Sequence, residues 1–279
     1  MSLRYGFNTN GVSNHRFEDA LSLISDSGYD GVALTLDHHH FDPFAPDFER
    51  RAEVLSSLLD KLKLGLVIET GARFLLNPRQ KHEPTLLSPE KDGRAKRIEF
   101  LKRAIDLAAI CRAEAVSFWA GVPQKTVSRE QAFCFLREGL QEILDYANER
   151  ETVLAFEPEP GMLIETVAEY RVLQREFPTL KLALDTGHCI VTNDCEPQNA
   201  VSEMRDFLGT VAIEDMKSGV HEHLFFGEGD MPIREILTAL QKINFEKLVC
   251  VELSRDSHRA HKIVPQAIEF LRNAENFEG

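Results

Sequence analysis

The chain has 279 residues, of which 43% are hydrophobic and 28% are charged, enough for one large domain or two modest ones. Its 45 acidic residues outnumber its 32 basic ones, and a formal net charge of −13 argues against DNA or RNA as a partner. No apolar run reaches the roughly 18 residues of a membrane span, and the N-terminus shows no signal-peptide pattern, so we expect no membrane partner. Five cysteines without a Cys-x-x-Cys pair favour the reducing cytoplasm.

Short strand-like segments alternate with helical patterns from one end of the chain to the other. The expected strands are residues 4–8, 31–36, 64–69, 115–120, 153–157, 180–185, 210–215 and 248–253. Several are apolar throughout, which is typical of strands that are covered on both faces. The clearest helical patterns, with apolar residues at three- and four-residue spacing, span about 94–113, 128–150, 233–243 and 260–275. Ser128 and Thr166 stand where helix N-caps are expected.

Eight strands that alternate with helices predict an α/β fold of the (β/α)₈ TIM barrel type, for which roughly 250 residues is typical. The alternative is an open doubly wound sheet, which usually carries a glycine-rich phosphate loop after its first strand. The segment 6-GFNTNGV-12 is not such a loop. No linker or low-complexity tract interrupts the series, so we expect one barrel domain over residues 1–279.

Ionisable residues gather at the carboxyl ends of the expected strands, where a barrel of this kind carries its chemistry. They are Asp37, His38, His39 and His40 after the second strand, Glu69 after the third, Glu157 after the fifth, Asp185 and His188 after the sixth, Glu214, Asp215, His221 and His223 after the seventh, and Glu252 after the eighth. A carboxylate buried alone costs several kcal/mol, so each needs a hydrogen bond, an ion pair or a metal. Any one of them is as compatible with a structural salt bridge as with ligation, but together they favour a shared metal ion.

The segment 220-VHEHLFFGEG-229 places two histidines two residues apart. Side chains at this spacing in an extended segment face the same way, so His221 and His223 can hold one ion. Gly227 and Gly229 are expected to let the following loop turn sharply and approach a ligand. Glu159, in contrast, is expected to pair locally.

Four segments in this order resemble the xylose isomerase-like TIM barrels. They are 154-LAFEPEPG-161, 182-LALDTGH-188, 221-HEHLFFGEG-229 and 250-CVEL-253. That family contains sugar and sugar-phosphate isomerases and epimerases, and also apurinic/apyrimidinic endonucleases. The resemblance implies a divalent cation bound by Glu157, Asp185 and Glu252.

The family's two branches imply different further ligands. Its isomerases add a histidine of the seventh strand within a His-x-x-Asp-x-Arg pattern. The matching stretch here is 212-AIEDMK-217, with Ala212 at the histidine and Lys217 at the arginine. In its endonucleases another cation takes three residues that correspond here to His188, His221 and His223. Imidazoles suit zinc, whereas carboxylates also suit manganese or magnesium, so zinc or manganese is expected, with magnesium as a further candidate.

The resemblance implies a metal-dependent isomerase or epimerase that acts on a small sugar, sugar phosphate or polyol ketone through an enediolate. Glu157 and Glu252 would transfer the carbon-bound proton, and Lys217 would contact a substrate oxygen. Further candidates for substrate contact are His39, Glu69, Arg73 and Trp119. In the loop after the third strand, Arg73, Arg79 and Lys81 are candidates to bind an acidic group or phosphate, although a solvated basic loop explains them equally well.

Three alternatives remain open at this point. A lyase or dehydratase uses the same enolate chemistry. A phosphodiesterase of the apurinic endonuclease type needs histidines where Glu69 and Trp119 align, and the acidic surface also argues against it. A sugar-binding barrel without turnover is kept open by Ala212. The resemblance is compatible with a homo-oligomer.

Overall fold

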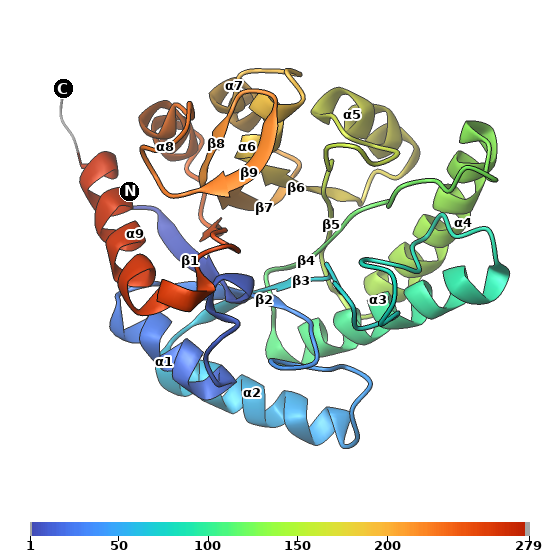
Figure 1. Ribbon diagram of the computed structural model, residues 1–279, viewed down its shortest axis with the longest axis horizontal. Helices are drawn as coiled ribbons and strands as arrows, with labels where there is room; N and C mark the ends of the chain where they lie inside the picture. The colour runs from blue at the N-terminus through green and yellow to red at the C-terminus, as the bar shows by residue number, and fades with distance from the viewer. Residues whose placement is uncertain (1, 277–279) are drawn as a thin grey trace.

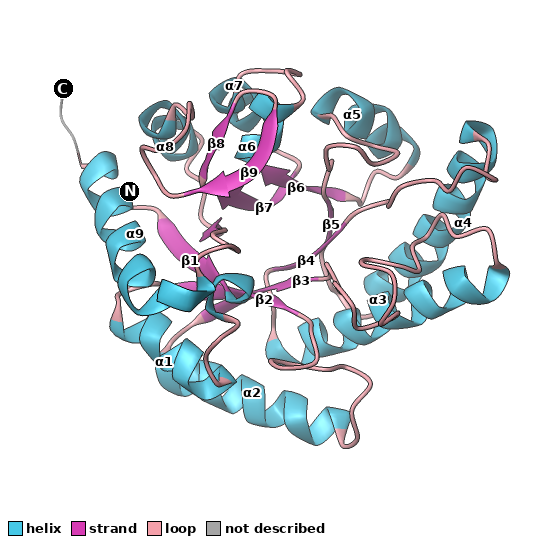
Figure 2. Ribbon diagram, viewed as in Figure 1, coloured by secondary structure: helices cyan, strands magenta, loops and turns pink. Residues whose placement is uncertain are grey.

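The computed structural model describes residues 2–276 and contains a closed barrel of parallel strands surrounded by helices (Figure 1 and Figure 2). Around the barrel the strands follow the order β1, β10, β7, β6, β5, β4, β3 and β2. The predicted (β/α)₈ fold is therefore confirmed. No helix within residues 2–276 is long and apolar enough to cross a membrane.

The barrel strands end within two residues of the predicted bounds. They are β1 (Arg4–Asn8), β2 (Gly31–Thr35), β3 (Gly65–Glu69), β4 (Ala115–Phe118), β5 (Leu154–Phe156), β6 (Lys181–Asp185), β7 (Leu208–Ile213) and β10 (Leu248–Val251). The α-helices are α1 (Phe17–Asp26), α2 (Phe48–Leu62), α3 (Lys91–Cys111), α4 (Arg129–Asn148), α5 (Val167–Glu176), α6 (Thr186–Val191), α7 (Pro197–Glu203), α8 (Ile233–Lys242) and α9 (Ala260–Glu275). Two 3₁₀ helices, η1 (Thr9–Val12) and η2 (Ser257–Arg259), follow β1 and β10.

Local sequence explains where the helices begin. The Ser128 side chain accepts a hydrogen bond from the backbone N–H of Gln131, and Thr166 accepts one from that of Glu169. Each hydroxyl satisfies one of the N–H groups that have no partner in the first helical turn. Both predicted N-caps are therefore confirmed.

Small residues let the strands close tightly at the amino-terminal end of the barrel. A Cβ atom on Gly31 would lie 2.4 Å from Leu248 Cδ1 and 2.8 Å from the Gly65 carbonyl oxygen. Within the barrel, Ala33 and Val67 pack with Leu248 and with the strand residue that follows it by two positions, Cys250. The interior of the barrel below the carboxyl ends of the strands is thus filled.

The seventh strand differs from its predicted course. Strand β7 ends at Ile213, and the chain then forms an antiparallel hairpin of β8 (Asp215–Lys217) and β9 (Val220–Leu224). This hairpin packs against α6 and projects from the barrel beside it (Figure 1). The carboxylate of Asp215 holds the hairpin to the next loop, accepting hydrogen bonds from Gly227 N at 2.7 Å and Met231 N at 3.0 Å.

Candidate active site

A cavity of about 500 Å³ lies at the carboxyl ends of the barrel strands. Its lining includes Glu69, Arg73, Trp119, Glu157, Asp185, His188, His221, His223 and Glu252. These residues come from β3, β4, β5, β6 and β10, from the segments after them, and from the hairpin strand β9. Residues that are far apart in the sequence therefore share one pocket, as the strand-end pattern predicts.

Asp185 ends β6 and caps α6. Its Oδ1 accepts hydrogen bonds from Gly187 N at 2.8 Å and His188 N at 3.2 Å, which fixes the carboxylate. Its Oδ2 is buried and has no hydrogen-bond donor among residues 2–276. A buried acceptor without a donor costs about 1–3 kcal/mol, and more when it is charged. This oxygen therefore needs a proton donor or a cation beside it.

The His188 ring is oriented by a backbone carbonyl. Its Nδ1 lies 2.9 Å from the Pro158 oxygen, and because a carbonyl only accepts, Nδ1 carries a proton. In the neutral ring Nε2 then presents a lone pair 3.3 Å from Asp185 Oδ2 and 3.2 Å from His221 Nε2. Lone pairs that face one another are stabilised only by a proton or a metal ion between them. A histidine whose other nitrogen donates to a carbonyl is the usual form of a metal ligand.

Charges around these two residues shift their pKa values in opposite directions. Burial lowers the pKa of His188, but the carboxylates of Asp185 and Glu159 outweigh burial and raise it overall. Burial raises the pKa of Asp185, but His188 and His223 outweigh burial and lower it overall. The pair thus behaves as an anion and a cation held in one buried place, and shifted pKa values of this kind concentrate at functional sites.

His221 and His223 do not face the same partners. His221 Nε2 lies 3.8 Å from Glu159 Oε1, whereas His223 Nε2 lies 3.9 Å from Glu252 Oε1. Burial, with His188 as the next cause, lowers the pKa of His221 to about 4, so this ring is neutral at pH 7 and able to bind a cation. The two rings thus lie beside different carboxylates, and their holding one ion stays a prediction.

Three overlapping groups of side chains have ligand atoms within 4.8 Å of one another. They are Glu157 with Asp185 and His188, Asp185 with His223 and Glu252, and Glu159 with His188 and His221. Glu159 thus lies close to His188 and His221, and its expected local pairing stays a prediction. Asp185 and His188 each belong to two groups, so they form the centre of the cluster.

Ala212 lies in the barrel wall beside one of these carboxylates, Asp185. It is the register partner of Asp185 on β6 and of Cys250 on β10. Register partners in a parallel sheet point to the same face, so a side chain at this position is directed toward Asp185. The methyl group leaves room there, and His223 reaches the neighbourhood from the hairpin.

The cavity carboxyl groups repel one another. Burial raises the pKa of Glu157 well above its ordinary value, and Glu159 raises it further. Burial likewise raises the pKa of Glu69, with Glu252 as the next cause. A divalent cation among these groups would reverse the effect and favour their charged forms.

Three neutral residues that were not predicted from the sequence donate hydrogen bonds to these carboxylates. Asn10 Nδ2 donates to Glu252 Oε1 at 2.9 Å, Thr35 Oγ1 to Glu69 Oε2 at 3.1 Å, and Ser117 Oγ to Glu157 Oε2 at 3.2 Å. Ser117 had a usable signal, because it is the one polar residue in the apolar strand β4. A single amide or hydroxyl elsewhere gives no comparable signal.

Glu214 lies at the turn between β7 and the hairpin and is fully buried. Neither of its carboxyl oxygens has a hydrogen-bond donor among the described residues. Burial raises its pKa well above the ordinary value, with Asp185 and Glu252 as further causes. A Cβ atom on Gly187 would lie 2.5 Å from Glu214 Oε1, so the backbone of Gly187 approaches this carboxyl group closely.

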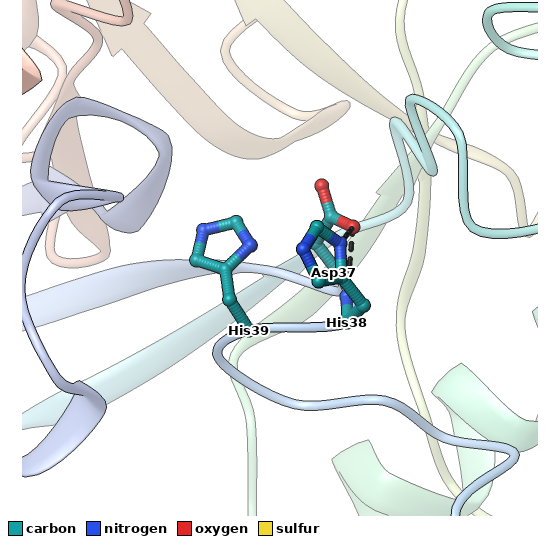
Figure 3. A group of neighbouring side chains, drawn as sticks. All are labelled: Asp37, His38 and His39. Atoms are coloured by element: carbon teal, nitrogen blue, oxygen red, sulfur yellow. Dashed lines mark hydrogen bonds and ion pairs between the residues drawn. The ribbon is translucent and has the colours of Figure 1, made fainter. Parts of the chain in front are cut away.

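Two predicted contact residues lie apart from the cavity lining. Lys217 is exposed on β8, and His39 is exposed in the loop after β2. Figure 3 shows His38 against the Asp37 carboxylate, with Nδ1 2.8 Å from Oδ1, and His39 to one side. These three form a separate group of potential ligands. The roles expected for Lys217 and His39 stay predictions that the cavity lining does not support.

Both glycines of the 227–229 segment serve the hairpin. Gly227 has φ of +89°, which side chains rarely adopt. A Cβ atom on Gly229 would lie 2.4 Å from the Met216 carbonyl oxygen. The close approach that was expected toward a ligand is therefore an approach to the chain itself.

Comparison with known proteins gives consistent results. A family model described as xylose isomerase-like TIM barrel matches residues 21–274. L-ribulose-5-phosphate 3-epimerase UlaE of Salmonella paratyphi A is 22% identical over 230 residues, which are 81% of this chain and 78% of that protein.

Solved structures resemble the barrel as a whole. D-allulose 3-epimerase from Methylomonas sp., in complex with D-allulose, matches with a TM-score of 0.77 and 18% identity over 98% of this chain and 97% of that one. The IOLI protein, whose structure holds a zinc atom, matches with a TM-score of 0.78 and 15% identity over 99% and 100%. At such identities these structural likenesses establish the fold alone.

Proposed function

We propose that this chain, which belongs to the xylose isomerase-like TIM barrel family, is a divalent-metal-dependent epimerase or isomerase of a small polyhydroxylated carbonyl compound. The observation that carries the proposal is the buried Asp185 Oδ2, which has no donor among the described residues and lies among imidazoles and carboxylates. The relatives named as ribulose-5-phosphate and allulose 3-epimerases support the same class of reaction.

Glu157, Asp185, His223 and Glu252 are the residues that we assign to the metal. The mixture of carboxylate oxygens and one imidazole suits manganese or zinc, and magnesium is accepted by the oxygens. His223 stands in for the side chain that Ala212 lacks, because its ligand atom lies within 4.8 Å of those of Asp185 and Glu252. Glu159, His188 and His221 offer a second set of donors, and the stoichiometry of bound metal tells one ion from two.

The bound metal supplies Lewis-acid polarisation of the substrate carbonyl and its neighbouring hydroxyl, which acidifies the proton on the carbon between them. Glu157 extends β5 and Glu252 extends β10, and β6 and β7 separate these strands around the barrel. The two carboxylates therefore flank a substrate that lies over Asp185. One removes the carbon-bound proton, and the other returns a proton to the opposite face, so no oxidant or reductant is needed.

The surrounding side chains hold this pair in place. Ser117 donates to Glu157 and Asn10 donates to Glu252, which limits the rotation of both carboxylates. Trp119, only 6% exposed, forms an apolar part of the wall and excludes water from the reacting carbon.

Hydrogen exchange tests the proposal directly. Protein stripped of metal and reloaded with manganese or zinc is incubated in heavy water with a panel of ketoses and ketose phosphates. We expect deuterium at one carbon next to the carbonyl, formation of the epimer, and loss of both in Asp185→Asn together with lower metal content. A product that has lost water would indicate a lyase. Cleavage of an abasic oligonucleotide without exchange on any sugar would indicate a phosphodiesterase and overturn the proposal.

A further inference from the structure

The loop between β3 and α3 brings two distant cations to the edge of the cavity. His82 N donates to the Arg73 carbonyl oxygen at 2.6 Å, and His82 Nδ1 lies 2.8 Å from the Gly71 oxygen. These two contacts hold residues 71–73 against His82, and we call this closed part of the loop its neck. Arg73 takes part in one of these contacts and Lys81 directly precedes His82. The neck therefore brings both residues to the cavity, which they line.

The neck adopts a backbone conformation that is unusual for its residues. Ala72 has φ of +48° and His82 has φ of +68°, although neither is glycine. The His82 ring packs edge-on against Trp119, with 5.4 Å between ring centroids. Unfavourable backbone conformations persist where the surroundings hold them, and they concentrate at ligand sites.

Arg73 and Lys81 have no carboxylate partner within the part of the chain that the structure describes. Among residues 2–276 neither side chain forms a hydrogen bond or an ion pair, although the chain carries a net charge of −13 and acidic residues line the same cavity. Arg255, the third cation of the lining, is paired with Glu222. Arg79, in the same loop, does not line the cavity. The basic residues of this loop thus fall into two that face the cavity and one that does not.

A further positive charge lies behind Trp119, which lines the cavity. Arg97 is fully buried, donates to the Thr70 carbonyl oxygen at 2.9 Å and lies 4.3 Å from the Trp119 ring centroid. Burial lowers the pKa of His82, and Lys81, Arg97 and Arg73 lower it further, against the hydrogen bond to Gly71 that raises it. Three cations, Arg73, Lys81 and Arg97, thus surround His82 at this part of the cavity.

We propose that Arg73 and Lys81 bind an anionic group of the substrate, a phosphate monoester or a carboxylate, at the end remote from its reacting carbonyl. The inference rests on the proposed function and narrows it to ketose phosphates or keto-sugar acids instead of neutral sugars. Lys81 lies close enough to His221 to help lower its pKa. Strand β3 lies across the barrel mouth from β7, so Arg73, four residues after β3, stands opposite the Asp185 and His223 side of the cavity. A cavity of about 500 Å³ accommodates a molecule that spans both.

Paired substrates test this assignment. Kinetics of deuterium exchange are measured on a ketose 5-phosphate, on the neutral ketose and on a keto-sugar acid, for Arg73→Ala, Lys81→Ala and Arg79→Ala. We expect the first two variants to raise KM roughly ten- to a hundredfold for an anionic substrate while kcat and the neutral ketose change little, as for lost charge-assisted hydrogen bonds. Arg79→Ala is the matched control and should leave all three unchanged. The phosphate and acid arms tell which anion the pair prefers.

A binding measurement separates this inference from the proposed function. Ketose phosphate and inorganic phosphate are titrated calorimetrically into wild-type protein and into the Arg73→Ala/Lys81→Ala double variant. Binding that the double variant loses, without exchange on any sugar, would retain the anion site and remove the epimerase. Exchange on the neutral ketose as efficient as on its phosphate, with equal phosphate binding by both proteins, would overturn the anion site and retain the epimerase. Lys81→Glu, at an exposed position, repeats the test without disturbing packing.

Discussion

The two sides of the cavity are built in different ways. On the side of β5, β6 and β10, carboxylates directly follow or end barrel strands, and their backbone groups stay within the sheet ladder. On the side of β3, the cations lie on an irregular loop that is held by its neck. The first arrangement fixes reacting groups precisely, and the second can vary in shape without disturbing the barrel. Catalysis and substrate selection are thus assigned to different structural elements.

The two sides also differ in charge. Burial and mutual repulsion raise the pKa of Glu157, so the carboxylate side needs a cation before it can be fully ionised. Arg73 and Lys81, on the other side, are cations in need of an anion. A metal and an anionic substrate together would complete both sides and orient the substrate between them. Changes on the carboxylate side should therefore alter turnover and metal content, and changes on the loop side should alter KM.

The largest effect is expected from Glu157→Gln and Glu252→Gln. Each removes a group that transfers a proton, and general acid or base catalysis contributes about a hundred- to ten-thousandfold to rate. We expect exchange from heavy water to fall by at least this factor while the fold, followed by circular dichroism, is retained. Ser117→Ala, which only removes a hydrogen bond to Glu157, should lose much less. Full exchange in either glutamine variant would remove that residue from the reaction.

The next effect concerns the imidazole on the hairpin. His223→Ala should weaken metal binding by at least about ten- to a hundredfold, the range seen when residues that support metal ligands are removed. Ala212→His in the same chain should restore part of the affinity, because position 212 is the register partner of Asp185. Metal content after dialysis against a chelator measures both. The exposed His261→Ala is the control. Unchanged metal content in His223→Ala would reassign the ligand to His188 or His221.

The sequence predicted which carboxylates meet at the cavity because the carboxyl ends of barrel strands can be recognised in it. An apolar run followed by a charged residue marks both the strand and the position of its last side chain, as with Asp185 after 181–184 and Glu252 after 248–251. The closed barrel then brings such residues to one rim whatever their separation along the chain. The meeting of these groups thus follows from fold and periodicity.

The remaining features depend on geometry that periodicity does not encode. Strand β7 ends before Glu214, and the hairpin that follows carries His221 and His223. These two histidines belong to different groups of potential metal ligands, although they are two residues apart. The neck of the β3 loop depends on positive φ values at Ala72 and His82. Neither residue is a glycine, which would have indicated a turn in the sequence. Arg73 and Arg79 therefore looked alike in the sequence and differ in the structure.

A smaller, pH-dependent effect tests the repulsion on the carboxylate side. Burial raises the pKa of Glu214 in the folded protein above its unfolded value of about 4.3. Above that unfolded value the folded state keeps a proton that the unfolded state has released, so stability falls as pH rises through the folded pKa. A folded-state pKa that is higher by one than the unfolded-state pKa corresponds to about 1.4 kcal/mol of this pH-dependent stability.

Urea denaturation of metal-free protein between about pH 5 and 8 measures this contribution. We expect wild type to lose stability with rising pH more steeply than Glu214→Gln, which has no proton to release. Glu235→Gln, at an exposed position on α8, should keep the wild-type slope. His221 acts in the opposite sense, since its pKa of about 4 removes stability as pH falls below about 6.5. Parallel slopes for wild type and Glu214→Gln would show that Glu214 is ionised in the folded state.

The smallest effect is expected at the neck of the loop. His82→Leu keeps a side chain of similar bulk against Trp119 but removes the hydrogen bond to the Gly71 oxygen, which is worth about 1 kcal/mol. Opening of the loop should then become about fivefold more frequent, without a change in global stability. Hydrogen exchange of residues 71–82, followed by mass spectrometry, measures this, with Arg79→Ala as the unchanged control. Because opening separates Arg73 from Lys81, KM for an anionic substrate should rise a few-fold, whereas KM for a neutral one should not. Unchanged exchange would mean that the contact with Trp119 alone holds the neck.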